Sequence, residues 1–204
     1  MKILPTIGPA TEKIKDLKYL FNYCNMVRLN SSHNNINWHK RVINLIKNID
    51  DKIEVLVDIP GVKPRTNNKT SIKIKKNEIV YFGHNLKFKT KNFISLTRKL
   101  PKKKSNISKL FSLDDGKILF KLIKFNNKFI SGRAIHDCII YPKKGLNIPN
   151  SVYDNVEQKN IYIDYLNNFK NTKINAFGLS FVQNKELIIF LKKKFSKFLM
   201  ISKI

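Results

Sequence analysis

Cysteine and long apolar runs are scarce in this sequence of 204 residues, and each scarcity excludes a class of protein. The two cysteines, Cys24 and Cys138, lie far apart and in no metal-type spacing. They exclude a disulfide scaffold and a zinc motif, and we expect free thiols in a reducing compartment. No apolar run approaches the ~20 residues that cross a bilayer, and residues 1–6 do not begin a secretory signal. These absences predict a cytoplasmic protein without a membrane partner.

Acidic residues are also scarce, because 14 Asp and Glu stand against 40 Lys and Arg, a formal net charge of +26. Such a charge attracts nucleic acid or an acidic membrane surface. The lysines are spread along the whole chain, however, and the basic and aromatic signature of an RNA-binding module is missing. Asn and Ile are abundant too, so an AT-rich coding bias also explains the charge, which by itself is nonspecific evidence. Nucleic-acid binding therefore stays an alternative.

The chain contains enough apolar material for a packed core, since 42% of its residues are hydrophobic and 11% are aromatic. The first 60 residues alternate between strand and helix patterns. We expect strands at 2–7, 26–29 and 53–59, with helices at 12–24 and 35–49. Thr11 is the expected N-cap of the first helix. The order β-α-β-α-β implies a parallel sheet.

The pattern changes between residues 66 and 141, where the helical period disappears. Alternating residues predict strands at 72–74 and 86–89, and 118–135 predicts a hairpin that turns at Asn126-Asn127. Residues 101–109 are expected to be a Lys-rich loop. Helices are predicted again at 155–169 and 184–194, with strands at 174–179 and 198–202. We therefore expect an α/β segment at 1–66, an inserted all-β domain at 67–140, and a continuation of the α/β part at 141–204.

Residues 26–33 combine an apolar strand with a dense set of hydrogen-bonding groups at its end. Arg28 and Asn30, two positions apart, would point to the same side of an extended strand. The carboxyl ends of strands are where α/β folds bind ligands. A cation, an amide, hydroxyls and an imidazole suit a ligand rich in negative oxygen, such as a phosphate or a carboxylate. A polar loop without a function is the competing interpretation.

Motif-like segments follow one another along the whole chain. The start, 2–11 (KILPTIGPAT), reads as an opening strand and turn, and 28–33 (RLNSSH) ends the second strand. The others are 58–65 (DIPGVKPR), 114–116 (DDG), 143–149 (KKGLNIP), 180–182 (SFV) and 201–204 (ISKI). In this order they resemble pyruvate kinase, although Ser31 stands where that family usually has Phe, and Val62 where it usually has Pro.

The resemblance implies the fold class: α/β, as a partial (β/α)8 TIM-type barrel of about five strands with an inserted small β-barrel domain. It covers the entire chain but only the first part of the family. Full-length members have a complete barrel, usually a C-terminal regulatory domain, and form homo-oligomers. We therefore expect either a truncated product or one half of a split enzyme whose barrel is completed by a second chain.

The resemblance also implies a glycolytic phosphotransferase that moves a phosphoryl group between phosphoenolpyruvate and ADP, giving pyruvate and ATP. Such catalysis is mostly positioning and charge stabilisation. Arg28 would bind the transferring phosphoryl group through its planar fork. Lys203 occupies the position of the family's catalytic lysine, which binds substrate and stabilises the transition state and the enolate. The nucleotide phosphates would lie along Asn30, Ser32, His33, Arg65 and Lys144.

Each of these roles has a structural alternative. A surface salt bridge would account for Arg28, and ordinary capping or turn bonding for Ser32. A structural hydrogen bond would account for His33. Without the motif, Lys203 would be read as a solvated charge.

The resemblance implies two metal cofactors. Asn30, Ser32, Asp58 and the Ile59 carbonyl would form an oxygen site for K+. Some family members carry Glu at the position of Lys63 and need potassium, whereas others carry Lys and do not. An ammonium is a compact charge able to replace the ion, so we expect potassium-independent activity.

Magnesium would lack its principal ligands, because the family's metal-binding acids would follow residue 204. Gln183, where Arg is common, is a further departure. Together they predict little or no kinase activity for this chain alone. The alternatives are a basic nucleic-acid-binding protein or a structural subunit on a relict kinase scaffold. Steeply salt-dependent binding to nucleic acid would favour the first, and co-purification with a complementary barrel half would favour the second.

Overall fold

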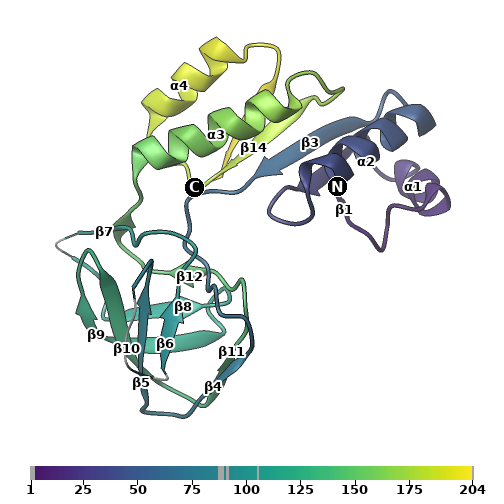
Figure 1. Cartoon of the computed structure of the whole chain (residues 1–204). Helices are drawn as coiled ribbons and strands as arrows, with labels where there is room; N and C mark the ends of the chain where they lie inside the picture. Colours follow the sequence, from purple (N-terminus) through teal and green to yellow (C-terminus); the bar gives the residue numbers. More distant parts are fainter. Residues whose placement is uncertain (1–2, 87–89, 91, 105, 204) are drawn as a thin grey trace. The chain divides into compact units, whose positions relative to one another are not determined.

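A computed structural model describes residues 3–86, 90, 92–104 and 106–203 (Figure 1). The chain forms two compact units. Unit 1 contains residues 1–61 and 155–204, and unit 2 contains residues 62–154. The second unit is wider than the all-β insert expected at 67–140. Backbone bonds explain the difference, because Thr66 exchanges hydrogen bonds with Lys143 and Lys144, and Arg65 forms a bridge with Gly145.

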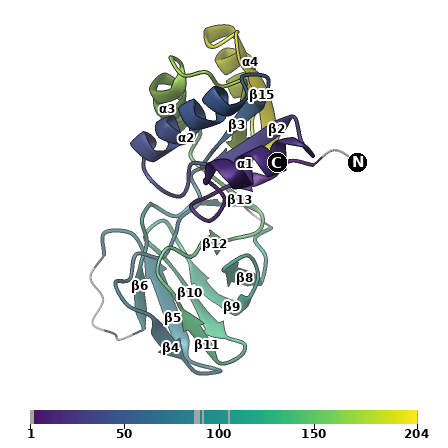
Figure 2. The same ribbon diagram turned by 90° about the vertical axis from the view of Figure 1, so that its right-hand side faces the viewer.

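Unit 1 is built on one parallel five-stranded sheet. Its strands lie in chain order, β1-β2-β3-β14-β15, and each neighbouring pair is parallel. Figure 2 shows β2, β3 and β15 of this sheet from the side. The strands are β1 Thr6–Ile7, β2 Met26–Asn30, β3 Glu54–Ile59, β14 Ala176–Ser180 and β15 Leu199–Lys203. This confirms the α/β class. The described strands form an open sheet with β1 and β15 at its edges, so closure into a barrel stays a prediction.

The helices of unit 1 are α1 Ile14–Phe21, α2 Ile36–Ile49, α3 Asn155–Phe169 and α4 Lys185–Lys194. Alternate side chains of the strands, such as Val27, Val55 and Phe177, join fully buried helix residues such as Ile43 and Tyr162 in one core. Burying each such side chain contributes roughly 1.5–3 kcal/mol. The residues that alternate with them along the strands, which include Arg28, Asp58 and Lys203, point to the other face of the sheet.

Two helices of unit 1 begin at asparagine caps, whereas the cap predicted for the first helix is wrong. The Asn35 side chain accepts from the Trp38 backbone N–H at 2.9 Å, and Asn184 accepts from the Leu187 N–H at 3.1 Å. Thr11 does not cap α1, because its hydroxyl bonds to the N–H and carbonyl of Gly8. This turn delays the start of α1 until Ile14.

Unit 2 is all-β in its described residues. A six-stranded sheet has the order β12-β8-β9-β10-β5-β6, and two small sheets pair β11 with β4 and β13 with β7. Figure 2 shows β6, β5, β10 and β9 side by side. The strands are β4 Ile72–Ile74, β5 Ile79–Gly83, β6 Phe93–Ser95, β7 Lys102–Lys103, β8 Leu110–Leu113, β9 Ile118–Phe125, β10 Phe129–Ala134, β11 Cys138–Ile140, β12 Leu146–Asn147 and β13 Ser151–Val152. A closed small barrel is therefore not confirmed.

The core of unit 2 is aromatic. The rings of Phe82, Phe111 and Phe120 lie 5.1–5.7 Å apart by their centroids. Gly132 makes this packing possible, because a Cβ at that position would lie 2.5 Å from Phe111 Cε1. The β9–β10 hairpin confirms the predicted turn at 126–127.

Three local predictions can be compared with these elements. The loop predicted at 101–109 is wrong at Lys102–Lys103, which pairs with Ser151–Val152. The strand predicted at 86–89 falls partly on residues 87–89, which lie outside the described residues. Both cysteines are free thiols, as predicted. Within the described residues, no helix is long and apolar enough to cross a membrane.

Candidate functional site

The carboxyl ends of the strands in unit 1 bring polar side chains from four strands together. The pairing places Asn30 of β2 beside Asp58 of β3, and Ser180 of β14 beside Lys203 of β15. Arg28 lies two residues before the end of β2, on the same side as Asn30. Ligands of parallel α/β sheets bind at this end of the strands. Arg28, Asn30, Asp58 and Lys203, which the sequence predicts as site residues, therefore lie at or near this end of the strands.

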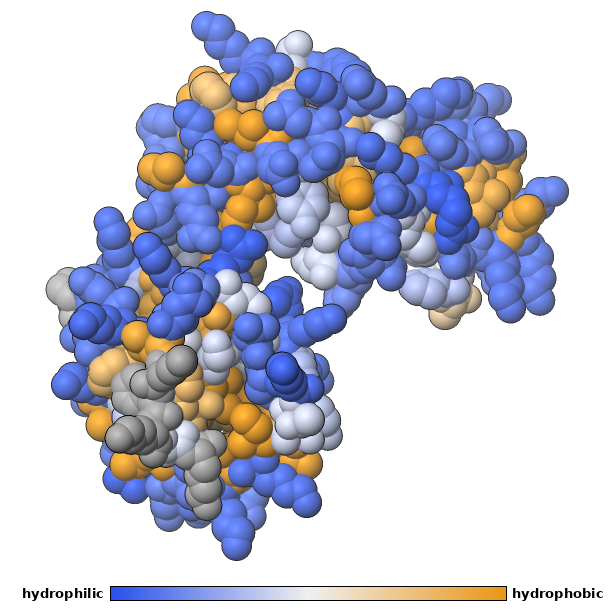
Figure 3. All heavy atoms as spheres, in the orientation of Figure 1, coloured by the Kyte–Doolittle hydropathy of each residue, from blue (hydrophilic) through white to orange (hydrophobic). Residues whose placement is uncertain are grey.

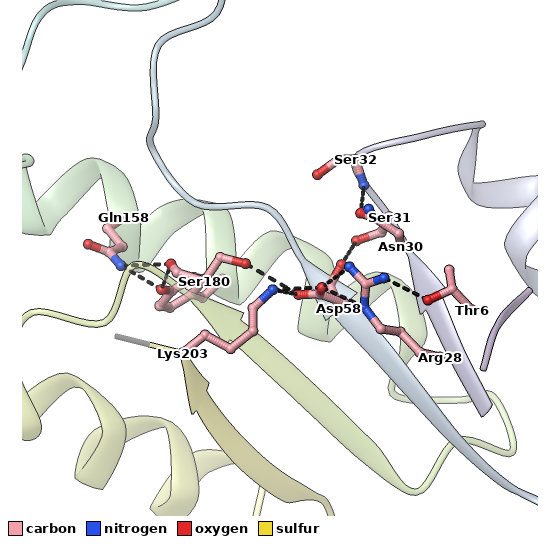
Figure 4. Close-up of polar contacts among 10 residues, drawn as sticks. Thr6, Arg28, Asn30, Ser31, Ser32, Asp58, Gln158, Ser180 and Lys203 are labelled. Atoms are coloured by element: carbon pink, nitrogen blue, oxygen red, sulfur yellow. Dashed lines mark hydrogen bonds and ion pairs between the residues drawn. The ribbon is translucent and has the colours of Figure 1, made fainter. Parts of the chain in front are cut away.

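Asp58 is the centre of this site, and its side chain is only 3% exposed. Its carboxylate accepts hydrogen bonds from Arg28 Nε at 2.8 Å and Arg28 Nη2 at 2.5 Å. Lys203 Nζ lies 2.6 Å from the same carboxylate, and Ser180 Oγ donates to Oδ1 at 3.2 Å (Figure 4). We call Arg28, Asp58, Ser180 and Lys203 the Asp58 cluster. A buried charge needs such partners, since an unpaired buried carboxylate is strongly unfavourable.

The Asp58 cluster carries a net positive charge and is open to solvent on its cationic side. Two cations share one carboxylate, and the side chains of Arg28 and Lys203 are 27% and 45% exposed. Arg28 is held by a further bond, because its Nη1 donates to Thr6 Oγ1 at 2.8 Å. A guanidinium and an ammonium held side by side bind an anion through charge-assisted hydrogen bonds. The arrangement therefore suits a phosphate or carboxylate.

Gly178 leaves the room that Asp58 occupies. A Cβ on Gly178, the neighbour of Asp58 across the β3–β14 pair, would lie 3.3 Å from Asp58 Oδ1. This contact is tighter than ordinary van der Waals packing. A side chain at position 178 would therefore press on the carboxylate that orients both cations.

The segment after β2 is fixed by bonds to Asp58 and Asn30. The Ser31 hydroxyl donates to the Asp58 carbonyl at 2.6 Å, and the Ser31 N–H donates to the same oxygen at 3.0 Å. The Asn30 side chain accepts from the Ser32 N–H at 3.1 Å. The side chains of Ser32 and His33 are exposed. Ser31 therefore has a structural role that sequence reasoning missed, because the residue was noted only as a departure from a motif.

His39 anchors the same segment from α2. Its side chain is 2% exposed, and Nε2 lies 2.8 Å from the His33 carbonyl oxygen. Nδ1 is buried without a hydrogen-bond partner in the described structure. Burial is the main cause that lowers the pKa of His39, so its neutral form is favoured. With the neutral ring, Nε2–H donates to the carbonyl and helps to hold the segment in place.

Unit 2 contains a second group of cations, Lys63, Arg65 and Lys144, which we call the unit 2 cation cluster. Lys144 Nζ lies 3.0 Å from Asp114 Oδ1, and Lys63 Nζ lies 3.6 Å from Asp115 Oδ1. Arg65 Nη1 donates to the Lys143 carbonyl at 3.0 Å. The acids come from the turn between β8 and β9, where Asp114 and Asp115 have φ angles of 52° and 55°. The turn therefore holds two carboxylates against two lysines.

The predicted site residues thus fall into two groups. In unit 1 the structure brings Arg28, Asp58 and Lys203 into contact and places Asn30 beside Asp58. Ser32 and His33 are exposed after β2, and Ile59 follows Asp58 in β3. Lys63, Arg65 and Lys144 belong to unit 2. Sequence reasoning gave no role to Ser180, although it noted the segment 180–182. Among the described residues, no group of three or more His, Cys, Asp or Glu could hold a metal ion. Hydrophilic side chains cover much of the face in Figure 3, which agrees with the basic composition.

Comparison with known proteins finds one family, pyruvate kinase, both by family model and by individual relatives. Residues 1–195 match the family model described as "Pyruvate kinase, barrel domain". A pyruvate kinase of Buchnera aphidicola is 34% identical over 156 residues, which cover 72% of this chain and 32% of the relative. A pyruvate kinase of Thermococcus litoralis is 25% identical over an alignment of 221 residues, which covers 100% of this chain and 45% of the relative. A pyruvate kinase of Staphylococcus epidermidis is 31% identical over 159 residues, which cover 72% of this chain and 27% of the relative. The chain spans less than half the length of these relatives.

Proposed function

The chain belongs to the pyruvate kinase family, and we propose that it takes part in phosphoryl transfer between phosphoenolpyruvate and ADP. The Asp58 cluster is the observation that carries this proposal, because it holds two cations at the ligand-binding end of a parallel sheet. Phosphoryl transfer requires cations at the oxygens where negative charge lies in the transition state. The relatives reported above are all named pyruvate kinases and give no support to a nucleic-acid-binding function.

Arg28 and Lys203 would bind the phosphoryl group and the developing enolate. Without ligand, Asp58 holds both side chains in place and balances part of their charge. The oxygens of a bound phosphoryl group would accept hydrogen bonds from N–H groups on the exposed side of the same two cations. Because the cations are already oriented by Asp58 and Thr6, little reorganisation would be needed when the anion binds. Asp58 is thus the residue that preorganises the site.

Arg65 and Lys144 are the proposed nucleotide-phosphate ligands within unit 2, and Asn30, Ser32 and His33 are those proposed within unit 1. Lys144 is held by Asp114, and Arg65 by the Lys143 carbonyl. Both cations are therefore kept near a fixed backbone position in unit 2. Arg65 would provide a planar fork for phosphate oxygens, whereas Lys144 would act as a point charge.

The proposed potassium site places Asn30, Ser32, Asp58 and the Ile59 carbonyl around a monovalent ion. The Asp58 carboxylate, the only charged member of this set, is already paired with Arg28 and Lys203. This pairing fits a site that works without a metal ion better than one that depends on it. Lys63 of unit 2 lies 3.6 Å from Asp115 Oδ1 through its Nζ, and its role as a replacing charge is proposed from the family pattern alone. Magnesium neutralises developing charge in phosphoryl transfer, but the described residues offer no group of three or more His, Cys, Asp or Glu that fits it.

A second polypeptide segment would extend the sheet of unit 1. Among the described strands, β15 pairs with β14 alone, and it exposes Leu199 and Ile201. A parallel edge strand with apolar side chains is a template for further pairing. We propose another β/α unit as this segment, because the relatives are more than twice as long as the part this chain matches.

Isothermal titration with phosphoenolpyruvate tests the proposal directly. We expect the chain to bind with a Kd of about 1 mM or tighter. Replacing Lys203 by methionine (Lys203→Met) keeps the stem of the side chain and removes the ammonium, and should weaken binding at least about tenfold. Lys192→Met makes the same change at an exposed position of α4 and should leave binding unchanged. Equal affinity in all three proteins, or no binding at all, would refute the proposed function.

A further inference from the structure

The turn that follows β14, residues 180–182, has a conformation that its own sequence does not favour. Phe181 has a φ of 62°, in the left-handed region that a bulky residue rarely adopts. Its ring also lies where Gly61 has no side chain, since a Cβ at Gly61 would be 2.4 Å from Phe181 Cδ2. Such a strained residue persists only when neighbouring groups hold it. The structure shows which groups do so.

Two side chains of α3 hold the carbonyl groups of this turn. Gln158 Nε2 donates to the Phe181 carbonyl at 2.5 Å. It also lies 3.3 Å from the Ser180 carbonyl, and Figure 4 shows Gln158 beside Ser180. The Tyr162 hydroxyl donates to the Ser180 carbonyl at 2.5 Å and also contacts Gln158 Nε2. Gln183 Nε2 lies 3.3 Å from Gln158 Oε1. Both groups of the Gln158 amide are therefore engaged around one turn.

These side chains are buried, which makes their polar groups informative. Gln158 is 1% exposed and Tyr162 is fully buried, and burial raises the pKa of Tyr162 to about 12. An amide or hydroxyl taken out of water is unfavourable unless it is hydrogen-bonded. An apolar residue at position 158 would fill the same space without that requirement. The amide is thus matched to the two carbonyl groups that it contacts.

The turn held in this way is hydrogen-bonded to two members of the Asp58 cluster, Lys203 and Asp58. The Val182 N–H donates to the Lys203 carbonyl at 2.9 Å, which fixes the backbone that carries the lysine. The Ser180 hydroxyl donates to Asp58 Oδ1 at 3.2 Å. A change in the turn would therefore move Lys203 through its backbone and Asp58 through its hydrogen bond.

We infer that Gln158 and Tyr162 are positioning residues that hold the turn at 180–182, and through it Lys203 and Asp58, in the geometry that binds a phosphate-bearing anion. The inference rests on the proposed function for the identity of the anion. Neither side chain belongs to the Asp58 cluster, and their effect passes through Ser180 and Val182.

Three variants test this inference on the whole chain. Gln158→Met keeps the length of the side chain and removes its hydrogen bonds, and Tyr162→Phe removes only the hydroxyl. Leu166→Ala is the control, because Leu166 is fully buried on the same helix and has no polar group. Each protein is studied by amide hydrogen exchange and by titration with phosphoenolpyruvate, at a temperature where it is fully folded.

Exchange of the Val182 amide relative to the amides of β3 reports on the turn without any ligand. We expect this ratio to rise at least about tenfold in Gln158→Met, less in Tyr162→Phe, and not at all in Leu166→Ala. The affinity for phosphoenolpyruvate should fall by about tenfold in Gln158→Met and stay unchanged in the control.

The outcomes separate this inference from the proposed function. An unchanged exchange ratio in both polar variants would overturn the positioning role. A raised ratio with wild-type affinity would show that the turn does not serve the anion site, and would overturn the inference as well. If the wild-type chain binds no phosphoenolpyruvate, the proposed function and the ligand named here fall together, whereas the exchange ratio still decides whether α3 holds the turn.

Discussion

Replacing Asp58 by asparagine is the most direct perturbation of the site, because the amide keeps the shape of the carboxylate and removes its charge. In the native chain the carboxylate accepts from Arg28, Lys203 and Ser180 while it is 3% exposed. In Asp58→Asn, the amide nitrogen would face a cation, and at least one donor would lose its acceptor. Asp58 therefore stabilises unit 1 as well as orienting the two cations.

The expected loss follows from burial. Removing one partner of a fully buried ion pair costs about 3–5 kcal/mol. Here Arg28 and Lys203 are 27% and 45% exposed, so both regain water when the charge of Asp58 is lost. Exposed pairs contribute only about 0–1 kcal/mol. Between these limits, we expect the free energy of unfolding to fall by about 1–3 kcal/mol.

Urea unfolding followed by tryptophan fluorescence measures this loss. Trp38, the single tryptophan, lies on α2 of unit 1 and reports on the unit that contains Asp58. Asp164→Asn is the matched control, because it makes the same chemical change at an exposed position of α3. An Asp58→Asn protein within about 0.5 kcal/mol of both the wild type and the control would refute the argument that the cluster is a buried charge pair.

Two further predictions concern His39 and Lys63. The folded-state pKa of His39 lies below the unfolded value of 6.5, so its neutral form stabilises the fold above pH 6.5 and that contribution is lost as the pH falls below it. His39→Gln should therefore show a flatter decline of unfolding free energy between about pH 6.5 and 5, and parallel curves for the two proteins would contradict this. For Lys63, we expect nucleotide binding or turnover to be equal in potassium and tetramethylammonium buffers, and a strong potassium requirement would contradict a replacing role.

The α/β elements of unit 1 are predictable because their sequence patterns are local. Residues 55–57 form a continuous apolar run in β3, whose residues after Glu54 are all buried, and the buried residues of α2, Val42, Ile43 and Ile46, follow the helical period. The Thr11 cap was wrong because the same hydroxyl satisfies a local turn with Gly8 instead. The sequence predicts a loop at Lys102–Lys103 because the strand partner of this segment, Ser151–Val152, is distant in the sequence. A local pattern does not carry that pairing.

The site was predictable to a similar degree. Arg28 and Asn30 were expected on one side of a strand, and the structure places them so. The pairing of Asp58 with Arg28 and Lys203 depends on the register of three strand pairs, which no local signal contains. The sequence does not reveal the roles of Gln158 and Tyr162. In a helix, a polar residue such as Gln158 is expected at the surface and an aromatic residue such as Tyr162 in the core. Their role appears only when the carbonyl groups of residues 180 and 181 are located.

The strong excess of positive charge makes the positions of the few acids informative. With 14 acidic residues among 204, most lysines have no acid available as a partner, and their mutual repulsion opposes the compact state. Asp58 nevertheless lies against two cations in unit 1, and Asp114 and Asp115 lie against Lys144 and Lys63 in unit 2. An acid placed only to relieve repulsion would be equally effective anywhere on such a surface. Asp58 is instead buried, at a strand end, and held by Ser180. Its position is therefore explained by the orientation of Arg28 and Lys203, and not by the overall charge.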